Sequence, residues 1–196
     1  MTTLPFLICC DIAGRTGVAT GIPGSVPILS TVQFVRPDED IERSLGRAAK
    51  WAISVADRTD GTKTVMFVEE PIAFRTKWGR SNYKTSRLLL GLWASVVGAF
   101  EARGIRVQTT AISSTRAWFC GDGRIPAERA KQEVVRIATA LGWAPRDDNQ
   151  ADAGSLWHYA SHLFDPRIKS PSEHWDINNE RARQSRSDQP IGNDAR

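Results

Sequence analysis

The chain has 196 residues, a formal net charge of +4 and 41% hydrophobic residues. That hydrophobic content is typical of a folded globular protein and excludes a disordered or collagen-like chain. The apolar, uncharged stretch 88–100 is too short to cross a bilayer, and residues 1–10 lack the basic start of a signal peptide. With only three cysteines, no disulfide framework is expected. We therefore expect a cytoplasmic protein that does not contact membranes.

The first predicted elements are three strands. Residues 4–12 are apolar and are followed by Ala13-Gly14, which predicts a buried strand and a tight turn. Residues 16–20 and 28–35 continue with strand-like composition after short connections that contain glycine or proline. Short connections of this kind favour antiparallel pairing, so we expect a three-stranded meander.

A helical pattern begins after the third strand, where Pro37-Asp38 precedes apolar residues spaced by three and four. Helices and strands then alternate, which is typical of parallel strands added to one sheet. The expected fold class is therefore α/β, a mixed sheet with helices on both faces. The expected elements are a helix that starts at Pro37-Asp38 and ends before Asp60-Gly61, a strand at 64–68, a helix at 85–103, a strand at 105–109, a helix at 127–141 and a helix from Asp147 or Asp148 to about 163.

The character of the chain changes after residue 164. Residues 165–196 are rich in charged side chains and contain few large apolar ones. Such a segment cannot bury enough apolar surface to fold by itself. We expect one folded domain at 1–164 and a polar, mobile tail at 165–196.

Positive charge is concentrated in the middle of the chain. Residues 71–136 contain twelve basic and four acidic side chains, while the remainder is net acidic. This distribution fits a protein that binds a polyanion such as nucleic acid. A set of solvated helix faces would give the same pattern.

Three carboxylates occupy positions where an isolated charge is costly. Asp11 lies within the first apolar strand, Glu69 closes the apolar run at 64–68, and Asp152 lies on the inward face of the last helix. Each alone could be a turn former, a strand exit or a hydrogen-bond acceptor. Together they repel one another unless a divalent cation such as Mg²⁺ binds them. Glu70 competes with Glu69, but strand alternation sends the two to opposite faces and favours Glu69.

Four segments of the chain form an ordered set. They are 10–19, with Asp11 before a glycine turn and Thr16-Gly17; 67–71, an apolar strand that closes on Glu69; 121–131, a Gly-x-Gly followed by Ala127 and Lys131; and 149–153, an Ala-Asp-Ala preceded by Asn149. This set resembles the motifs of the RuvC family of Holliday junction resolvases, within the RNase H-like nuclease superfamily. The resemblance covers residues 4–164 with the spacing of a compact, phage-type member. It implies a five-stranded RNase H-like sheet and a nuclease domain at 1–164.

The resemblance also implies an activity. It is that of a metal-dependent endonuclease that resolves Holliday junctions or related branched DNA, such as forks and flaps, by paired nicks. The products would carry 5′-phosphate and 3′-hydroxyl ends, and the enzyme would act as a homodimer on its symmetric substrate. Two Mg²⁺ ions, replaceable by Mn²⁺, would be bound at each site.

The same resemblance assigns catalytic residues. Asp11, Glu69 and Asp152 would bind the metal ions, and Lys131 would offset phosphate charge. The fourth ligand is open, because Asn149 stands where the family has Asp or His, and Asp148 is one residue earlier on the same helix face. For Lys131, a solvated position on an amphipathic helix is the alternative.

The basic segment after Glu69 is the expected DNA-binding region, together with Arg116 and Arg124. Cations there can contact phosphates, and aromatic side chains can stack on unpaired bases or pack beneath the loop instead. The candidate residues of this basic segment are Phe74, Arg75, Lys77, Trp78, Arg80, Tyr83, Lys84 and Arg87.

The apolar helix at 85–103 is the expected dimer interface, with burial in the core as the alternative.

Two other functions fit parts of the sequence. A non-catalytic relative could bind branched DNA as a scaffold, but the presence of Asp11, Glu69 and Asp152 argues against this. An actin-like ATPase or sugar kinase also contains a strand and glycine turn that resemble 11–17. That class needs a second phosphate loop rich in Gly and Thr, which this sequence lacks.

Overall fold

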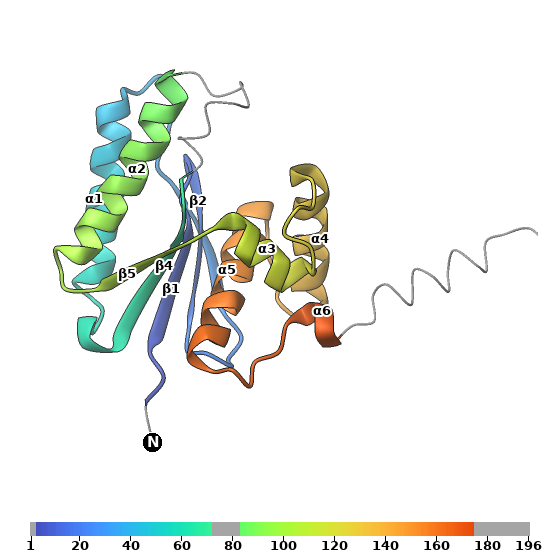
Figure 1. The fold of residues 1–196 in the computed structure, drawn as a ribbon. Helices are drawn as coiled ribbons and strands as arrows, with labels where there is room; N and C mark the ends of the chain where they lie inside the picture. The colour runs from blue at the N-terminus through green and yellow to red at the C-terminus, as the bar shows by residue number, and fades with distance from the viewer. Residues whose placement is uncertain (1–2, 72–82, 175–196) are drawn as a thin grey trace, which may run out of the picture.

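The computed structural model describes residues 3–71 and 83–174, which form a sheet covered by helices on both faces (Figure 1). The five strands have the order β3-β2-β1-β4-β5. The first three strands pair antiparallel, whereas β4 runs parallel to β1 and β5 parallel to β4. The predicted meander with added parallel strands is therefore confirmed. The strands are β1 (Phe6–Asp11), β2 (Arg15–Gly21), β3 (Ile28–Gln33), β4 (Thr64–Glu69) and β5 (Arg106–Thr110).

Helices α1 (Ile41–Ala56) and α2 (Tyr83–Glu101) cover one face of the sheet (Figure 1). The buried side of α1 consists of small residues, Ser44 and three alanines, so the helix can lie close to its neighbours, and Phe100 of α2 is fully buried in the same core. A short 3-10 turn, Gly61–Lys63, leads from α1 into β4. Side chains alternate between the two faces along each strand. Those that point to α1 and α2 are on the face opposite the candidate carboxylates.

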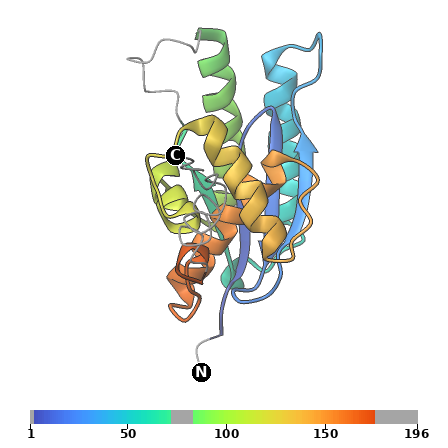
Figure 2. The same cartoon turned by 90° about the vertical axis from the view of Figure 1, so that its right-hand side faces the viewer.

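The other face is covered by α3 (Ile112–Cys120), α4 (Ala127–Ala140) and α5 (Asp148–Phe164), and Figure 2 shows α4 outside α5. Helix α5 lies directly on the sheet, and Leu156 and Trp157 are among its buried residues. The side chain of Asp147 caps α5 by accepting a hydrogen bond from the Gln150 amide at 2.9 Å. Of the two cap residues expected from the sequence, Asp147 and Asp148, Asp147 is therefore the one that caps the helix.

Helix α3 was not predicted from the sequence. Its stretch of serine and threonine has low helix propensity, and the helix is only nine residues long. Packing stabilises it instead, because Phe119 is fully buried and stacks near Trp143. Gly121, with a φ of 78°, ends the helix in the left-handed region.

The chain continues to pack after α5. The backbone carbonyl of Ile168 contacts His162 Nδ1 at 2.9 Å, and the Ser170 hydroxyl donates to the Trp118 carbonyl of α3. A short helix, α6 (Pro171–His174), lies against α3. Residues 165–174 thus extend the folded part beyond the expected boundary at 164, while the rest of the expected tail lies outside the described residues.

The cysteines are all free thiols. Cys9 and Cys10 are fully buried in the middle of β1, and they point to opposite faces of the sheet. Burial raises the pKa of both thiols well above the ordinary value, so both stay protonated at neutral pH. Cys120 of α3 is half-buried, and burial raises its pKa to about 12.

Candidate active site

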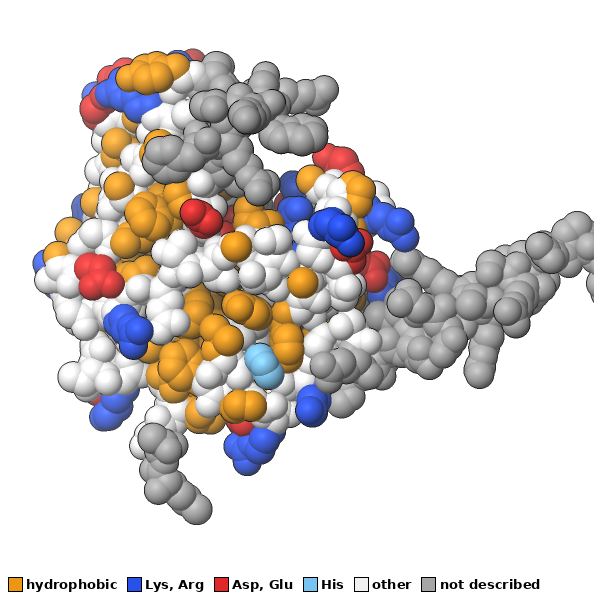
Figure 3. Space-filling view, in the orientation of Figure 1, with side chains coloured by type: hydrophobic (Ala, Val, Ile, Leu, Met, Phe, Trp, Pro, Cys, Tyr) orange, Lys and Arg blue, Asp and Glu red, His pale blue; other side chains and the backbone are white. Residues whose placement is uncertain are grey.

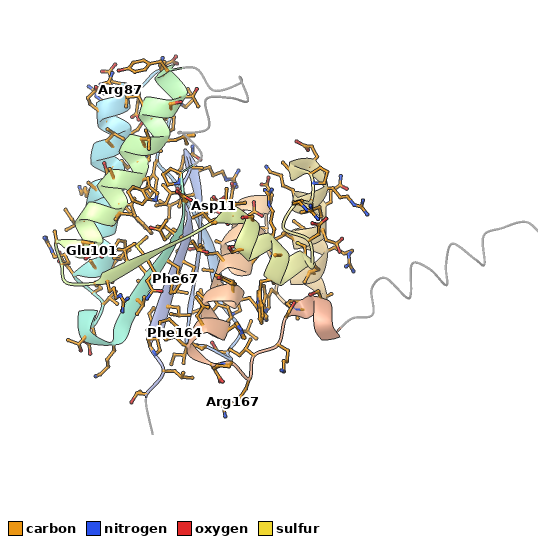
Figure 4. The ribbon with its side chains drawn as sticks, viewed as in Figure 1. Asp11, Phe67, Arg87, Glu101, Phe164 and Arg167 are labelled. Atoms are coloured by element: carbon orange, nitrogen blue, oxygen red, sulfur yellow. The ribbon has the colours of Figure 1, made fainter. Side chains whose placement is uncertain are left out.

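Asp11 and Glu69 are neighbours on two parallel strands. Strand β1 pairs with β4 up to Cys10 opposite Val68, and the next position on each strand is the carboxylate. Both side chains point to the face covered by α5, because Cys9 and Phe67, two residues earlier, belong to the core on that face. Glu69 rather than Glu70 therefore accompanies Asp11. Figure 4 shows Asp11 at the end of β1, between α2 and α3.

Gly17 allows α5 to approach this pair. It lies opposite Asp11 on β2, and a Cβ atom there would lie 1.8 Å from the carbonyl oxygen of Asn149. Only a residue without a side chain permits such close contact between the first turn of α5 and the sheet. The contact brings Asp148 and Asp152 of α5 over the end of β1. In the sequence, Gly17 stands out only as part of the motif at 10–19, and its spacing role is visible only in the fold.

The carboxylates influence one another. Burial is the largest factor that raises the pKa of Glu69 to about 8, and the charges of Asp11 and Asp152 raise it further. Burial and then Asp11 raise the pKa of Asp152 to about 7. The pKa of Asp11 is also raised, by burial first and by Asp148 among its neighbours. Four acidic side chains from β1, β4 and α5 thus gather at one place where negative charge is costly.

Two basic side chains face the same place. The ammonium group of Lys131 on α4 donates to Asp148 Oδ2 at 2.7 Å, which raises the pKa of the lysine and lowers that of Asp148. The charge of Lys131 also lowers the pKa of Asp11, and Arg116 of α3 does so for Asp11, Glu69 and Asp152. Arg116 was expected among DNA-binding residues, and the structure places its charge beside the carboxylates.

A cavity of about 200 Å³ opens beside Asp11 and Glu69. Its other wall is formed by Leu89 and Trp93 of α2, so apolar surface faces the acidic side chains. The indole N–H of Trp93 is buried and has no hydrogen-bond partner among the described residues. The cavity is large enough for part of a substrate next to the carboxylates.

The chemistry of this donor set suits a hard divalent cation, because all four acidic groups offer oxygen ligands. In the part of the chain described here, no group of three or more His, Cys, Asp or Glu side chains is arranged so that it could hold a metal ion. A cage of three ligands around a single ion is therefore not formed. Mg²⁺ commonly takes only one or two protein carboxylates and completes its shell with water and phosphate. Pairs of carboxylates that share Asp11 meet that requirement.

The expected DNA-binding residues fall into three groups. Tyr83 and Lys84 lie on the exposed first turn of α2, whereas Arg87 pairs with Glu42 of α1. Arg124 is exposed in the connection between α3 and α4, where Figure 3 shows basic side chains gathered with a few acidic ones. The others, Phe74, Arg75, Lys77, Trp78 and Arg80, lie outside the described residues.

No known family model matches the chain, and no curated protein does. Among solved structures, it is similar to RuvC of Thermus thermophilus, with a TM-score of 0.58 and 21% identity over 83% of this chain and 96% of that chain. It is also similar to T. thermophilus RuvC in complex with a Holliday junction substrate, with a TM-score of 0.61, 19% identity and coverage of 84% and 96%. The chain has a RuvC-like fold. The expected RNase H-like sheet is thereby confirmed.

The RuvC-like fold places the motif residues without assigning their roles, because identity is low. Asp11, Glu69 and Asp152 lie on β1, β4 and α5, close enough for the charge of Asp11 to act on the other two. Between Asp148 and Asn149, it is Asp148 whose charge acts on the other carboxylates. Within the described ranges, no helix has the length and apolar character that a membrane span needs.

Proposed function

We propose that the chain is a metal-dependent endonuclease that cuts branched DNA, Holliday junctions in particular, by paired nicks that leave 5′-phosphate and 3′-hydroxyl ends. The observation that carries the proposal is the convergence of Asp11, Glu69 and Asp152: the charge of Asp11 raises the pKa of both other carboxyl groups, and the charge of Asp152 raises the pKa of Glu69. Mutual repulsion of this kind destabilises a fold, so its presence in a RuvC-like fold points to a cation that relieves it.

The ions would be held by pairs of carboxylates that share Asp11, one pair with Glu69 and the other with Asp152, and Asp148 would lie beside the second pair. Two Mg²⁺ ions, or Mn²⁺ in their place, would supply charge stabilisation at the phosphate and an activated water. Lys131 holds Asp148 in position through its 2.7 Å contact and places a positive charge near the scissile phosphate. Arg116 adds a second positive charge from α3, which offsets the charge of the bound phosphate.

The substrate and assembly follow from the same proposal. A four-way junction has two-fold symmetry, so two nicks at matched positions require two active sites, and we propose a homodimer. The exposed cations of α2 and of the α3–α4 connection would contact DNA phosphates. Three free thiols, two of them buried, are suited to a reducing compartment, so we propose that the protein acts in the cytoplasm.

Cleavage of a labelled four-way junction tests the proposal. The wild-type protein should nick two opposite strands in Mg²⁺ or Mn²⁺, and Asp11→Asn should abolish cleavage but still bind the junction. Asp57→Asn, which alters an exposed carboxylate paired with Arg103 at the distant end of α1, is the matched control and should cut normally. Cleavage that persists in Asp11→Asn would contradict the metal site. Binding without cleavage by the wild type would instead favour a scaffold, and preference for forks or flaps would broaden the substrate.

A further inference from the structure

A groove of about 670 Å³ lies apart from the carboxylate cavity. One wall is the edge strand β3, and the other is the connection between α4 and α5, which runs beside β3 (Figure 2). Leu29 and Trp143 give the groove an apolar lining, and Thr31 adds a hydroxyl group. No residue expected from the sequence to bind DNA lines it.

The walls of the groove are joined by a chain of polar contacts. Arg15 donates to Asp147 at 2.7 Å, and the Thr31 hydroxyl donates to the same carboxylate oxygen at 3.0 Å. The side-chain amide of Gln150 in turn donates to the Thr31 hydroxyl at 3.0 Å, and its oxygen accepts from the backbone N–H of Arg146 at the same distance. These contacts hold β2, β3 and α5 together, so the groove is formed before any ligand binds.

The groove lies near the candidate active site, on the other side of the first turn of α5, which rests on Gly17. Asp11, Gly17 and Thr31 occupy one row across β1, β2 and β3, because Asp11 lies opposite Gly17 and Gly17 opposite Thr31. Two strand spacings separate the ends of the row, or about 10 Å. At 3.4 Å per nucleotide along a strand of DNA, that span corresponds to about three nucleotides. Asp147 and Asp148 make the same link on α5, since one lines the groove and the next residue faces the carboxylates.

The charge of the groove favours an anion. Asp147 is neutralised by Arg15, whose own side chain remains 57% exposed. Arg146 is exposed, and its guanidinium has no hydrogen-bond or ion-pair partner within residues 3–71 and 83–174. The charge of Arg146 is therefore unbalanced, and it lies beside the apolar lining of Leu29 and Trp143. A sugar–phosphate backbone offers both negative charge and apolar surface, so it fits this lining better than a peptide that is only acidic or only apolar.

We propose that this groove binds the backbone of the DNA strand that leads away from the scissile phosphate, with Arg146 contacting a phosphate about three nucleotides from the cut. This proposal rests on the proposed nuclease function. It adds a second contact surface, on the β3 edge of the sheet, to the one formed by α2 and the α3–α4 connection. A strand held at both surfaces would cross the carboxylates in a fixed direction.

Charge reversal at Arg146 tests the groove in the full-length protein. Junction binding is measured by fluorescence anisotropy in EDTA, where cleavage does not interfere. Arg146→Glu should weaken binding about tenfold and reduce the slope of log affinity against log salt by about one. Arg146→Lys should retain most of the affinity. The matched control is Arg106→Glu, on the exposed start of β5 at the opposite edge of the sheet, which should bind as the wild type does.

Replacing one phosphate at a time with a neutral methylphosphonate locates the phosphate that Arg146 contacts. After the wild-type cut is mapped, single methylphosphonates are placed at successive positions within four nucleotides on either side. One position about three nucleotides from the cut should weaken the wild type and leave Arg146→Glu unaffected, since that variant has already lost the contact. If all positions affect both proteins equally, or if Arg146→Glu and Arg106→Glu bind alike, the groove does not bind DNA. Self-association of the wild type that Arg146→Glu abolishes would assign the groove to a second copy instead.

The two proposals fail in different ways. A wild type that cuts junctions while the Arg146 variants match their control retains the nuclease function and loses the groove. A wild type that neither binds nor cuts branched DNA overturns both. Circular dichroism of each variant confirms that a loss of binding does not come from unfolding.

Discussion

At the scale of single residues, the buried carboxylates connect stability with function. Glu69 and Asp152 have pKa values of about 8 and 7, because burial and Asp11 penalise their charged forms. Without a cation, the folded protein therefore binds protons at neutral pH that the unfolded chain would release. The ionised cluster lowers the stability of the cation-free protein, and a bound cation restores it.

Replacing Glu69 with Gln should stabilise the cation-free protein at high pH. An unfolded Glu titrates near pH 4.3, so between that value and pH 8 the folded state holds the extra proton and stability falls as pH rises. In EDTA at pH 8.5, Glu69→Gln should be more stable than the wild type by on the order of 2 kcal/mol. The difference should shrink toward pH 5. Urea denaturation at both pH values measures it, and equal differences would contradict the burial of this charge.

Metal binding should release protons from the same groups. At pH 7, Mn²⁺ must displace the protons held by Glu69 and Asp152, whereas at pH 9.5 both are already ionised. Calorimetry in buffers of different ionisation enthalpy should give about 1.4 protons released per site at pH 7 and almost none at pH 9.5. Asp11→Asn should weaken Mn²⁺ binding most, because Asp11 is common to both pairs. A proton count that does not change with pH would mean that the metal binds elsewhere.

At the scale of elements, the position of α5 determines the site. Its first turn rests on Gly17, and from there it carries Asp148 and Asp152 over the end of β1. Strand alternation and helical periodicity predict Asp11, Glu69 and Asp152 because each lies in a long, regular pattern. They do not decide between Asp148 and Asn149, which are adjacent, and the contact with Lys131 on another helix distinguishes them.

Other parts of the site depend on contacts that local patterns do not contain. Helix α3, which carries Arg116, has weak helix propensity and is stabilised by packing against α5. The ion pair of Arg15 and Asp147 joins residues 132 positions apart. Its partners look like ordinary surface residues in the sequence. Arg146, beside this pair, gives no local signal either.

Substituting Gly17 with Ala should displace α5. The added Cβ would overlap the Asn149 carbonyl, and that atom belongs to the backbone, so the helix itself must move. We expect a loss of about 1–3 kcal/mol in the free energy of unfolding and a fall in cleavage of about a hundredfold. Gly46→Ala is the matched control, since a Cβ there meets open space on α1, and it should be neutral or stabilising. Equal stability and cleavage for the two variants would contradict the close contact.

At the scale of the whole molecule, much of the apolar surface of α2 is used within one chain. Leu92, Val96 and Phe100 are buried in the core between α2, α1 and the sheet. Leu89 and Trp93 face the cavity beside the carboxylates. The face that remains for a partner is therefore narrower than the sequence suggested, and the dimer interface on this helix stays a prediction.

Leu90→Glu tests that interface. Leu90 is only half-buried and lies on neither the cavity nor the core side of α2. A charge there should leave the fold of one chain intact but prevent dimers, which sedimentation equilibrium measures. Paired nicks should then become single, independent nicks. Leu163→Glu, at a 49% exposed position on α5, is the control and should remain dimeric. A dimeric Leu90→Glu would place the interface on another surface.

The two cysteines of β1 can report the order in which the two helical layers detach from the sheet. Cys9 lies in the core beneath α5, and its neighbour Cys10 lies in the core beneath α1 and α2. Neither thiol can react with an alkylating reagent until its own covering layer detaches, and the raised pKa values keep the intact protein inert. The ratio of label on the two adjacent positions, read by mass spectrometry, therefore reports which side of the central strand is uncovered first. If α5, which carries Asp148 and Asp152, detaches before α1 and α2, the label will appear first on Cys9.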